Sequence, residues 1–201
     1  MLPPHIQADI KYLCETDKVF KKSGIQIHDF SWRKRDSVFP SLMRTIIGQQ
    51  LSVKAASTIW QRVEDGVGDI SPKGFSKIDD DALRGYGLSR QKISYARELC
   101  DAVKSKRFIP DDILDMEDED VLQTITSLKG FGEWSAQMIL IFTLARADIW
   151  PTGDLGVREG VRLYKKSDVR PDISDTEKFG QKFKGRRTAA ALLLWKLKDK
   201  V

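Results

Sequence analysis

Apolar residues recur at intervals of three and four along almost the whole chain, the spacing that places side chains on one face of an α-helix. The pattern is clear in residues 6–14 and 53–63, and in 89–104, where Ser89 is a suitable N-cap. No stretch alternates apolar and polar residues over several positions, as a half-buried strand would. The sequence therefore predicts an all-α protein of about ten short helices. Further helices are predicted over residues 116–125, 134–145, 175–184 and 188–198.

The composition is typical of a globular protein with a real core. The chain has 201 residues, of which 41% are hydrophobic and 31% charged, enough for one large or two small domains. No apolar run reaches the roughly 18 residues of a membrane span, and the start of the chain lacks the pattern of a secretion signal. The only cysteines are Cys14 and Cys100, which excludes a four-cysteine iron–sulfur cluster and fits a reducing compartment.

The chain carries a net charge of +5, and its charges are segregated along the sequence. Basic residues cluster at 33–35, 165–166 and 182–187, whereas acidic residues concentrate at 111–120. A basic balance favours anionic partners, and nucleic acid is the commonest soluble one. Segregation fits one face toward DNA and another toward water, although each cluster alone also fits an ordinary solvated helix face.

Residues 128–158 hold the most informative motif. They open with a glycine-rich turn at 130–132 between two helical segments, continue through the apolar helix 134–145, and reach Asp154 at the start of a third helix. A glycine-rich turn at a helix start can hold a phosphate with backbone N–H groups. A carboxylate one helix later can act on the molecule to which that phosphate belongs. Together these features predict a grip on DNA and a catalytic acid.

Several blocks of sequence resemble one known family. They are LKGFGEWSA at 128–136, PTGDLG at 151–156, a helix-loop-helix block at 39–56, a block at 87–96 and the terminal helix at 189–195. On these blocks the chain resembles the helix-hairpin-helix (HhH-GPD) DNA glycosylases of base-excision DNA repair. Within them it is similar to the 3-methyladenine DNA glycosylase II branch, whose members remove alkylated purines. The resemblance covers essentially the whole chain and departs at Lys129, where the family usually has proline.

The resemblance implies two helical subdomains with the active-site cleft between them. Residues 1–36 and 146–201 would form a bundle from both chain ends. Residues 37–145 would form a helical domain that carries the helix-hairpin-helix at about 118–145.

The resemblance also implies that the hairpin turn grips a DNA phosphate through backbone N–H groups. The residues expected to contact DNA lie in the turn or carry a positive charge that could reach a phosphate; they are Lys129, Gly130, Phe131, Gly132, Glu133 and Arg187. Arg158 and Arg186 are further basic candidates. The alternatives are a simple turn and ordinary surface charges.

The family hairpin can bind a structural monovalent cation, Na+ or K+, through backbone carbonyls. The matching carbonyls are those of Thr126, Leu128 and Phe131. The resemblance implies no metal or organic cofactor for the chemistry itself.

Asp154 is the expected catalytic residue. Cleaving an N-glycosidic bond generates positive charge on the sugar, and a fixed carboxylate stabilises that charge and can activate the attacking water. The alternative is a plain N-cap, a role that aspartate fills well, and both roles can coexist. Family members that also cut the strand can carry a lysine where this chain has Trp134, so a monofunctional enzyme is expected.

The flipped base needs a pocket, and the resemblance assigns Trp134 and Trp195 to it, with Met138 one helical turn from Trp134. Electron-rich indole faces would attract a cationic alkylated base, although both tryptophans could instead be core residues. The gap left in the duplex would be filled from the loop 48–52 by Gln50, or next by Leu51. The alternative for this loop is a buried polar pair that ties two helices together.

The sequence thus predicts a monofunctional DNA glycosylase for alkylated purines, with 3-methyladenine as the main substrate and 7-methylguanine or ethenoadenine as candidates. The alternatives are a glycosylase for another lesion class, a non-catalytic protein that binds damaged DNA, and a plain helical scaffold. The expected partner is double-stranded DNA with damaged bases, and we expect a monomer with no membrane attachment. The expected compartment is the cytoplasm, at the nucleoid, in a bacterium, or the nucleus in a eukaryote.

Overall fold

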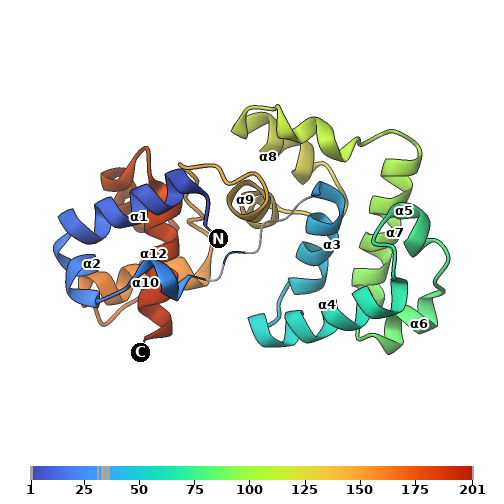
Figure 1. The fold of residues 1–201 in the computed structure, drawn as a ribbon, viewed down its shortest axis with the longest axis horizontal. Coiled ribbons are helices and arrows are strands. Elements are labelled where there is room, and N and C mark those ends of the chain that lie inside the picture. The colour runs from blue at the N-terminus through green and yellow to red at the C-terminus, as the bar shows by residue number, and fades with distance from the viewer. Residues whose placement is uncertain (1, 31, 33–36, 201) are drawn as a thin grey trace. The chain divides into compact units, whose positions relative to one another are not determined.

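The computed structural model describes residues 2–30, 32 and 37–200, and this part of the chain contains helices and no strand (Figure 1). The predicted all-α fold is confirmed. The α-helices are α1 (Pro4–Thr16), α2 (Lys18–Ser23), α3 (Val38–Gly48), α4 (Val53–Val67), α5 (Pro72–Phe75), α6 (Asp80–Gly85), α7 (Arg90–Lys104), α8 (Asp118–Thr126), α9 (Glu133–Phe142), α10 (Leu155–Lys165), α11 (Ile173–Gly180) and α12 (Arg187–Asp199). Short 3₁₀ helices are η1 (Ile27–Asp29), η2 (Pro110–Leu114) and η3 (Gln181–Phe183). None of the described helices is long and apolar enough to cross a membrane.

The chain divides into two compact units. The end unit comprises Met1–Lys34 and Leu140–Val201, and the middle unit comprises Arg35–Ile139. The sequence placed the second boundary after residue 145, but the structure places it inside α9. The reason is packing, because Phe142 and Ala145 lie against the hydrophobic core of the end unit.

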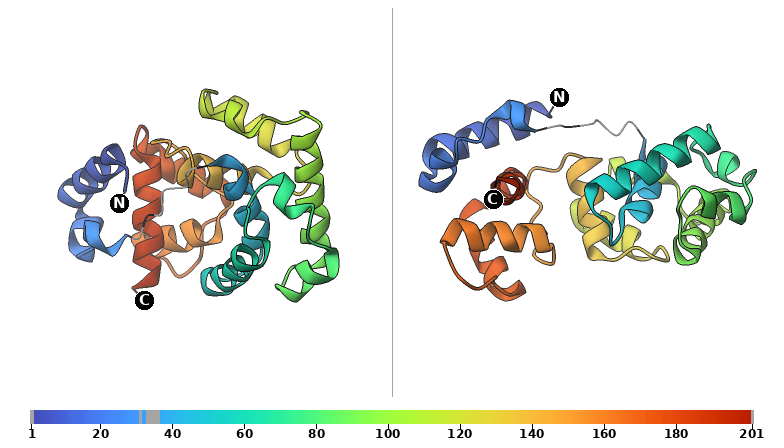
Figure 2. Two further views of the ribbon diagram at one scale, coloured as in Figure 1. Left: turned by 45° about the vertical axis from the view of Figure 1, so that its right-hand side comes forward. Right: turned by 90° about the horizontal axis from the view of Figure 1, so that it is seen from below.

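The end unit is built on the close pairing of α10 and α12, which lie against each other (Figure 2). Gly160 on α10 makes this approach possible, because a Cβ at that position would lie 2.6 Å from the carbonyl oxygen of Leu194 on α12. Helix α1 packs on the same α12 through its apolar face. The central side chains of this core are fully buried; they include Ile6, Ile10, Val157, Val161, Leu193 and Leu194.

In the middle unit, α3 and α5 pack against α7, whose predicted start is confirmed: Ser89 accepts a hydrogen bond from the backbone N–H of Lys92 (3.2 Å). Arg97 on α7 fixes the segment between α5 and α6, donating to the carbonyls of Phe75 (2.6 Å) and Ile78 (2.5 Å).

Some helix ends differ from the sequence prediction, most clearly in α9. The apolar pattern suggested a helix to residue 145, but α9 ends at Phe142. Ala145 adopts a left-handed conformation (φ 54°), and the N–H of Arg146 donates to the carbonyl of Leu140 (2.9 Å). This hydrogen bond reaches back six residues, so the chain turns out of the helix before its apolar pattern stops. Helix α8 starts two residues later than predicted, and the segment predicted over 175–184 divides into α11 and η3.

Candidate active site and nucleic-acid interface

The hairpin of the middle unit consists of α8, the turn at 127–132 and α9. Gly130 has a positive φ of 91°, and a Cβ there would lie 2.3 Å from the ring of Tyr95. Glycine is therefore required at Gly130 both by the backbone and by the ring packed on it. A Cβ at Gly132 would meet no described atom within 4 Å, so the backbone there is open to the approach of a ligand.

The side chain of Phe131 lies in the core, with only 6% exposed. The predicted DNA contact of Phe131 would therefore use its backbone. Its N–H donates to the carbonyl of Leu128 (3.1 Å), which tightens the turn. The carbonyls of Thr126, Leu128 and Phe131 remain the predicted cation ligands, and no group of three or more His, Cys, Asp or Glu side chains in the described residues could hold a metal ion.

The loop between α3 and α4 is fastened to the hairpin by Gln49. Its amide Nε2 donates to the carbonyl oxygen of Gly130 (2.8 Å) and to the hydroxyl of Ser135 (3.4 Å). Gln50 follows in a left-handed conformation (φ 57°) and is exposed, as is Leu51. Gln49 thus plays the tying role that the sequence left open for this loop, while both predicted wedge residues point away from the core. The partner of Gln49 could not be predicted, because nothing in the sequence links residue 49 to residue 130.

Two predicted pocket residues lie on α9, where four-residue spacing puts them on the same side of the helix. Trp134 is 37% exposed, whereas Met138 is only 6% exposed. Glu133, also predicted to touch DNA, accepts a hydrogen bond from Gln137 (2.9 Å). Trp134 is therefore accessible to a ligand, and Met138 mainly supports it from the core.

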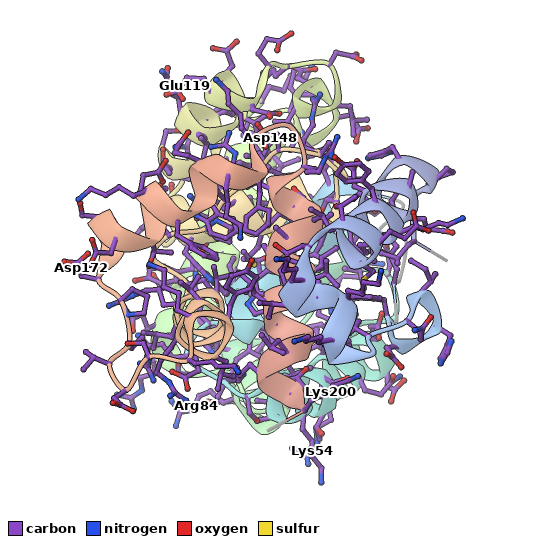
Figure 3. All side chains as sticks on the ribbon, turned by 90° about the vertical axis from the view of Figure 1, so that its left-hand side faces the viewer. Lys54, Arg84, Glu119, Asp148, Asp172 and Lys200 are labelled. Carbon is purple, nitrogen blue, oxygen red and sulfur yellow. The ribbon has the colours of Figure 1, made fainter. Side chains whose placement is uncertain are left out.

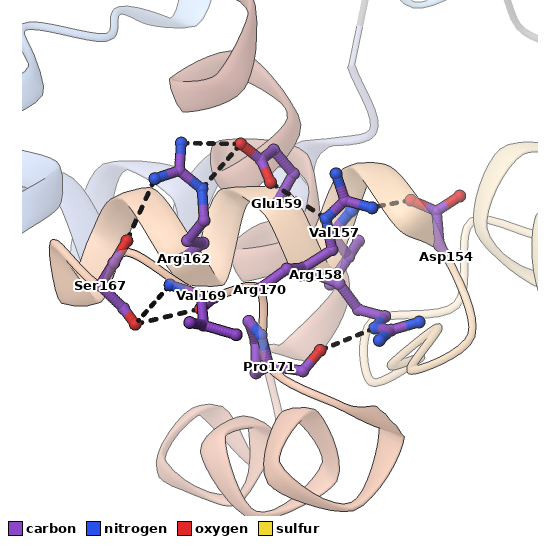
Figure 4. Close-up of polar contacts among 9 residues, drawn as sticks. All are labelled: Asp154, Val157, Arg158, Glu159, Arg162, Ser167, Val169, Arg170 and Pro171. Carbon is purple, nitrogen blue, oxygen red and sulfur yellow. Dashed lines mark hydrogen bonds and ion pairs between the residues drawn. The ribbon is translucent and has the colours of Figure 1, made fainter.

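Asp154 sits at the start of α10 in the end unit. Its Oδ1 accepts a hydrogen bond from the backbone N–H of Val157 (2.8 Å), which is an N-cap (Figure 4). The same Oδ1 accepts a second hydrogen bond from the indole Nε1–H of Trp195 on α12 (2.8 Å). The cap therefore exists, and in addition the structure brings two predicted site residues into direct contact. Two donors on one oxygen fix the orientation of the carboxylate.

Trp195 lies at the end of a row of aromatic rings. Its ring stacks on Phe142 at 5.8 Å between centroids and 20° between planes, and Phe142 in turn contacts Trp32 at 5.5 Å. The sequence analysis missed Trp32 and Phe142. Phe142 was visible only as one more apolar position of a helix, and Trp32 lies in no recognisable motif. Together the three rings form an aromatic row that ends at the hydrogen-bonded carboxylate of Asp154.

The outer side of α10 is held by ion pairs. Glu159 lies 2.8 Å from Arg162 and 3.0 Å from Arg170, and hydrogen bonds from these two arginines lower the pKa of Glu159 (Figure 4). The Nε of Arg158 donates to the carbonyl of Pro171 (2.9 Å). These contacts fix the loop between α10 and α11 and so hold the helix that Asp154 begins. Arg158, a candidate phosphate contact, has a structural partner here.

Arg187 also has a structural partner. Its Nε and a terminal nitrogen donate to the two carboxylate oxygens of Asp148, at 2.8 and 2.9 Å, and Figure 3 labels this partly buried residue. Burial opposes ionisation of Asp148, but the hydrogen bonds and charge of Arg187 and the backbone N–H of Gly185 lower its pKa overall. The contact of Arg187 with DNA stays a prediction. Lys129 is exposed, and the basic cluster 33–35 lies outside the described residues.

An all-helical chain with a glycine hairpin, and with a capped carboxylate beside aromatic rings, has the features of the helix-hairpin-helix proteins that act on bases in DNA. Residues 43–185 match the HhH-GPD superfamily of base excision DNA repair proteins, and the chain belongs to that family. The family predicted from the sequence is thereby confirmed.

The named relatives point to one branch. DNA-3-methyladenine glycosylase 1 of Schizosaccharomyces pombe is 31% identical over 163 residues, which cover 79% of this chain and 71% of the relative. The structure of an S. pombe 3-methyladenine DNA glycosylase with abasic DNA superposes with a TM-score of 0.83 at 26% identity, covering 94% of this chain and 95% of that one. A DNA-3-methyladenine glycosidase from Bacillus halodurans superposes with a TM-score of 0.74 at 31% identity, covering 94% and 88%. These similarities confirm the predicted branch.

Proposed function

We propose that this chain is a DNA glycosylase that hydrolyses the N-glycosidic bond of alkylated purines in duplex DNA, with 3-methyladenine as its main substrate. The observation that carries the proposal is Asp154, held by two N–H donors at the end of an aromatic row. The names of the relatives give the substrate class, since both the S. pombe and the B. halodurans proteins are described as acting on 3-methyladenine.

The chemistry requires an anion at a fixed place. As the bond between the sugar C1′ and the purine nitrogen breaks, its electron pair leaves with the base and positive charge develops on the sugar. The carboxylate of Asp154 would stabilise that charge and accept a proton from the attacking water, whose oxygen then bonds to C1′. A group aimed at developing charge in this way is typically worth about 3–4 kcal/mol.

The substrate preference would come from the aromatic groups. An N3- or N7-alkylated purine is already cationic, so it leaves without a proton from the enzyme. The indole faces of Trp134 and Trp195 attract such a cation, and each contact is worth roughly 0.5–2 kcal/mol. Normal purines are neutral, so they neither leave without a proton nor gain this attraction to the indole faces. 7-Methylguanine is cationic like 3-methyladenine and has both properties. Ethenoadenine would enter as a further substrate through stacking.

The product would be an intact abasic site. Trp134 occupies the position where strand-cutting relatives can carry a lysine, so water rather than an amine would attack the sugar. The reaction needs no metal or organic cofactor. A structural Na+ or K+ on the carbonyls of Thr126, Leu128 and Phe131 would only support the hairpin turn.

DNA would be held by the middle unit's hairpin. Backbone N–H groups of Gly130, Gly132 and Glu133 and the exposed Lys129 would contact a phosphate, and Arg187 would add a contact from the end unit. Gln50 and Leu51 are exposed on a loop fixed to the same turn by Gln49, so either can enter the duplex when the damaged base flips out. The protein would act as a monomer wherever the cell keeps its DNA.

The test is release of free base from methylated duplex DNA by the wild-type chain and by Asp154→Asn. The matched control is Asp172→Asn, because Asp172 caps α11 with the same type of hydrogen bond, from the N–H of Asp175 (2.7 Å). We expect release by the wild type and by Asp172→Asn, and none by a folded Asp154→Asn chain that still binds DNA. Binding of damaged DNA without release by the wild type would overturn the proposal in favour of another lesion or a non-catalytic damage-binding protein.

A further inference from the structure

Gly156 lies in the first turn of α10, two residues after Asp154. A Cβ at this position would lie 2.7 Å from Cδ1 and 2.8 Å from Nε1 of Trp195, and 3.0 Å from Oδ1 of Asp154. The indole edge and the carboxylate oxygen therefore both occupy the space that any other side chain would need. These are the two groups joined by the hydrogen bond from Trp195 to Asp154.

We propose that Gly156 and Trp195 are positioning residues for Asp154: the missing side chain at 156 lets the indole N–H reach the carboxylate and set its orientation. This inference rests on the proposed function, because it concerns the orientation of the proposed catalytic group. Glycine is the poorest helix former after proline, so its presence in the first turn of α10 is unfavourable by local propensity. The close approach of the indole gives a reason for it.

Two neighbouring glycines separate this role from ordinary packing. Gly160 also lies on α10 against α12, but the three atoms nearest to a Cβ there would all belong to Leu194, the nearest at 2.6 Å. Gly153 directly precedes Asp154, and a Cβ there would meet no described atom within 4 Å. Gly160→Ala therefore measures how strained helix packing alone affects the rate of base release. Gly153→Ala measures the effect on that rate of an extra methyl group beside Asp154.

The experiment measures base release in single turnovers, with enzyme in excess over methylated duplex DNA, together with DNA affinity and thermal melting. We expect Gly156→Ala to slow release by about tenfold or more, the loss that follows when a hydrogen bond to a charged group is broken. DNA affinity should stay within about twofold, since Gly156 is not one of the residues proposed to hold DNA. Gly153→Ala should match the wild type, and Gly160→Ala should lower the melting temperature without a comparable loss of rate.

A double-mutant cycle then tests the route of the effect. Trp195→Phe removes the N–H donor but keeps a ring, and should slow release to about the same extent as Gly156→Ala. If Gly156 acts by placing the indole, adding Gly156→Ala to Trp195→Phe should change the rate by less than about twofold. Full additivity, or equal rates for Gly156→Ala and Gly153→Ala, would overturn the inference. Absence of release by the wild type would instead overturn the proposed function.

Discussion

Two successive helices of the end unit, α10 and α11, both begin with an aspartate N-cap, but the surroundings of the two aspartates differ. Asp154 caps α10 and Asp172 caps α11, each through one carboxylate oxygen and the N–H three residues on, at 2.8 and 2.7 Å. Asp172 is exposed at the surface (Figure 3). Asp154 is partly buried and receives a second hydrogen bond from Trp195, whose ring continues into the aromatic row.

Asp154 and Asp172 therefore share the N-cap hydrogen bond, but only Asp154 has the second donor and the neighbouring aromatic ring. An N-cap aspartate is a stabilising device that any helix can use. It becomes a candidate for catalysis only where a second donor fixes it and aromatic rings can hold a base beside it. A sequence pattern of aspartate before a helix therefore carries little functional information without residues contributed from far along the chain, here from α12.

The largest effect should come from removing each carboxylate. Asp154→Ala and Asp172→Ala should each lower the free energy of unfolding by about 1 kcal/mol, because each helix loses its cap. Only Asp154→Ala should also lower the rate of base release, by about 100- to 1,000-fold, since it removes a charge-stabilising group. Denaturant unfolding and single-turnover release measure the two quantities. A similar loss of the rate of base release in both variants would contradict the claim that Asp154, unlike Asp172, has a role beyond capping its helix.

A smaller effect separates two indole N–H groups. Trp195 donates to Asp154, whereas the buried Trp150 donates to the carbonyl of Thr176 (2.9 Å). Trp195→Phe should slow base release by about tenfold. Trp150→Phe should leave the rate unchanged but lower the free energy of unfolding by about 1–3 kcal/mol, because a buried carbonyl loses its donor. An unchanged rate for Trp195→Phe, together with a slower rate for Trp150→Phe, would contradict the role given to Trp195.

The smallest effect concerns a third carboxylate near a helix start. Asp148 is held by Arg187 at the first residue of α12, and its pKa is lowered from 3.8. A lowered folded-state pKa contributes stability that is present above the unfolded-state pKa and is lost as the pH falls through the folded-state value. Asp148→Asn should therefore be less stable than the wild type at neutral pH, and the difference should shrink once the pH falls below 3.8.

Urea unfolding of both chains at several pH values measures this difference, with Asp175→Asn as the control. Asp175 makes only a long surface ion pair with Lys178 (3.8 Å), so its substitution should matter little at any pH. A constant difference for Asp148→Asn across the acid range would show that the ion pair with Arg187 contributes no pH-dependent stability.

Much of this architecture could be predicted from local pattern. The three-and-four spacing gave the helical class, Ser89 marked the start of α7, and the glycine turn marked the hairpin. What could not be predicted depends on contacts between distant residues. The hydrogen bond from Trp195 to Asp154 spans 41 positions, and that from Gln49 to Gly130 spans 81.

Some helix ends could not be predicted from the spacing of apolar residues either, as the end of α9 shows. The apolar run that suggested a helix to residue 145 continues past Phe142, where α9 ends, and Ala145 already has a left-handed conformation. Phe142 and Ala145 are apolar because they pack against the core of the end unit, although Ala145 no longer belongs to α9. Apolar spacing indicates which side chains are buried, and in this segment side chains are buried beyond the end of α9.

The hydrogen bond between Gln49 and Gly130 would have a consequence for the proposed probing of DNA. It joins the loop carrying Gln50 and Leu51 to the glycine turn when the chain folds. The conformational entropy of that loop is then lost once, during folding, rather than at each encounter with a duplex. Under the proposed function, this preformed loop would probe successive base pairs without having to become ordered before each one.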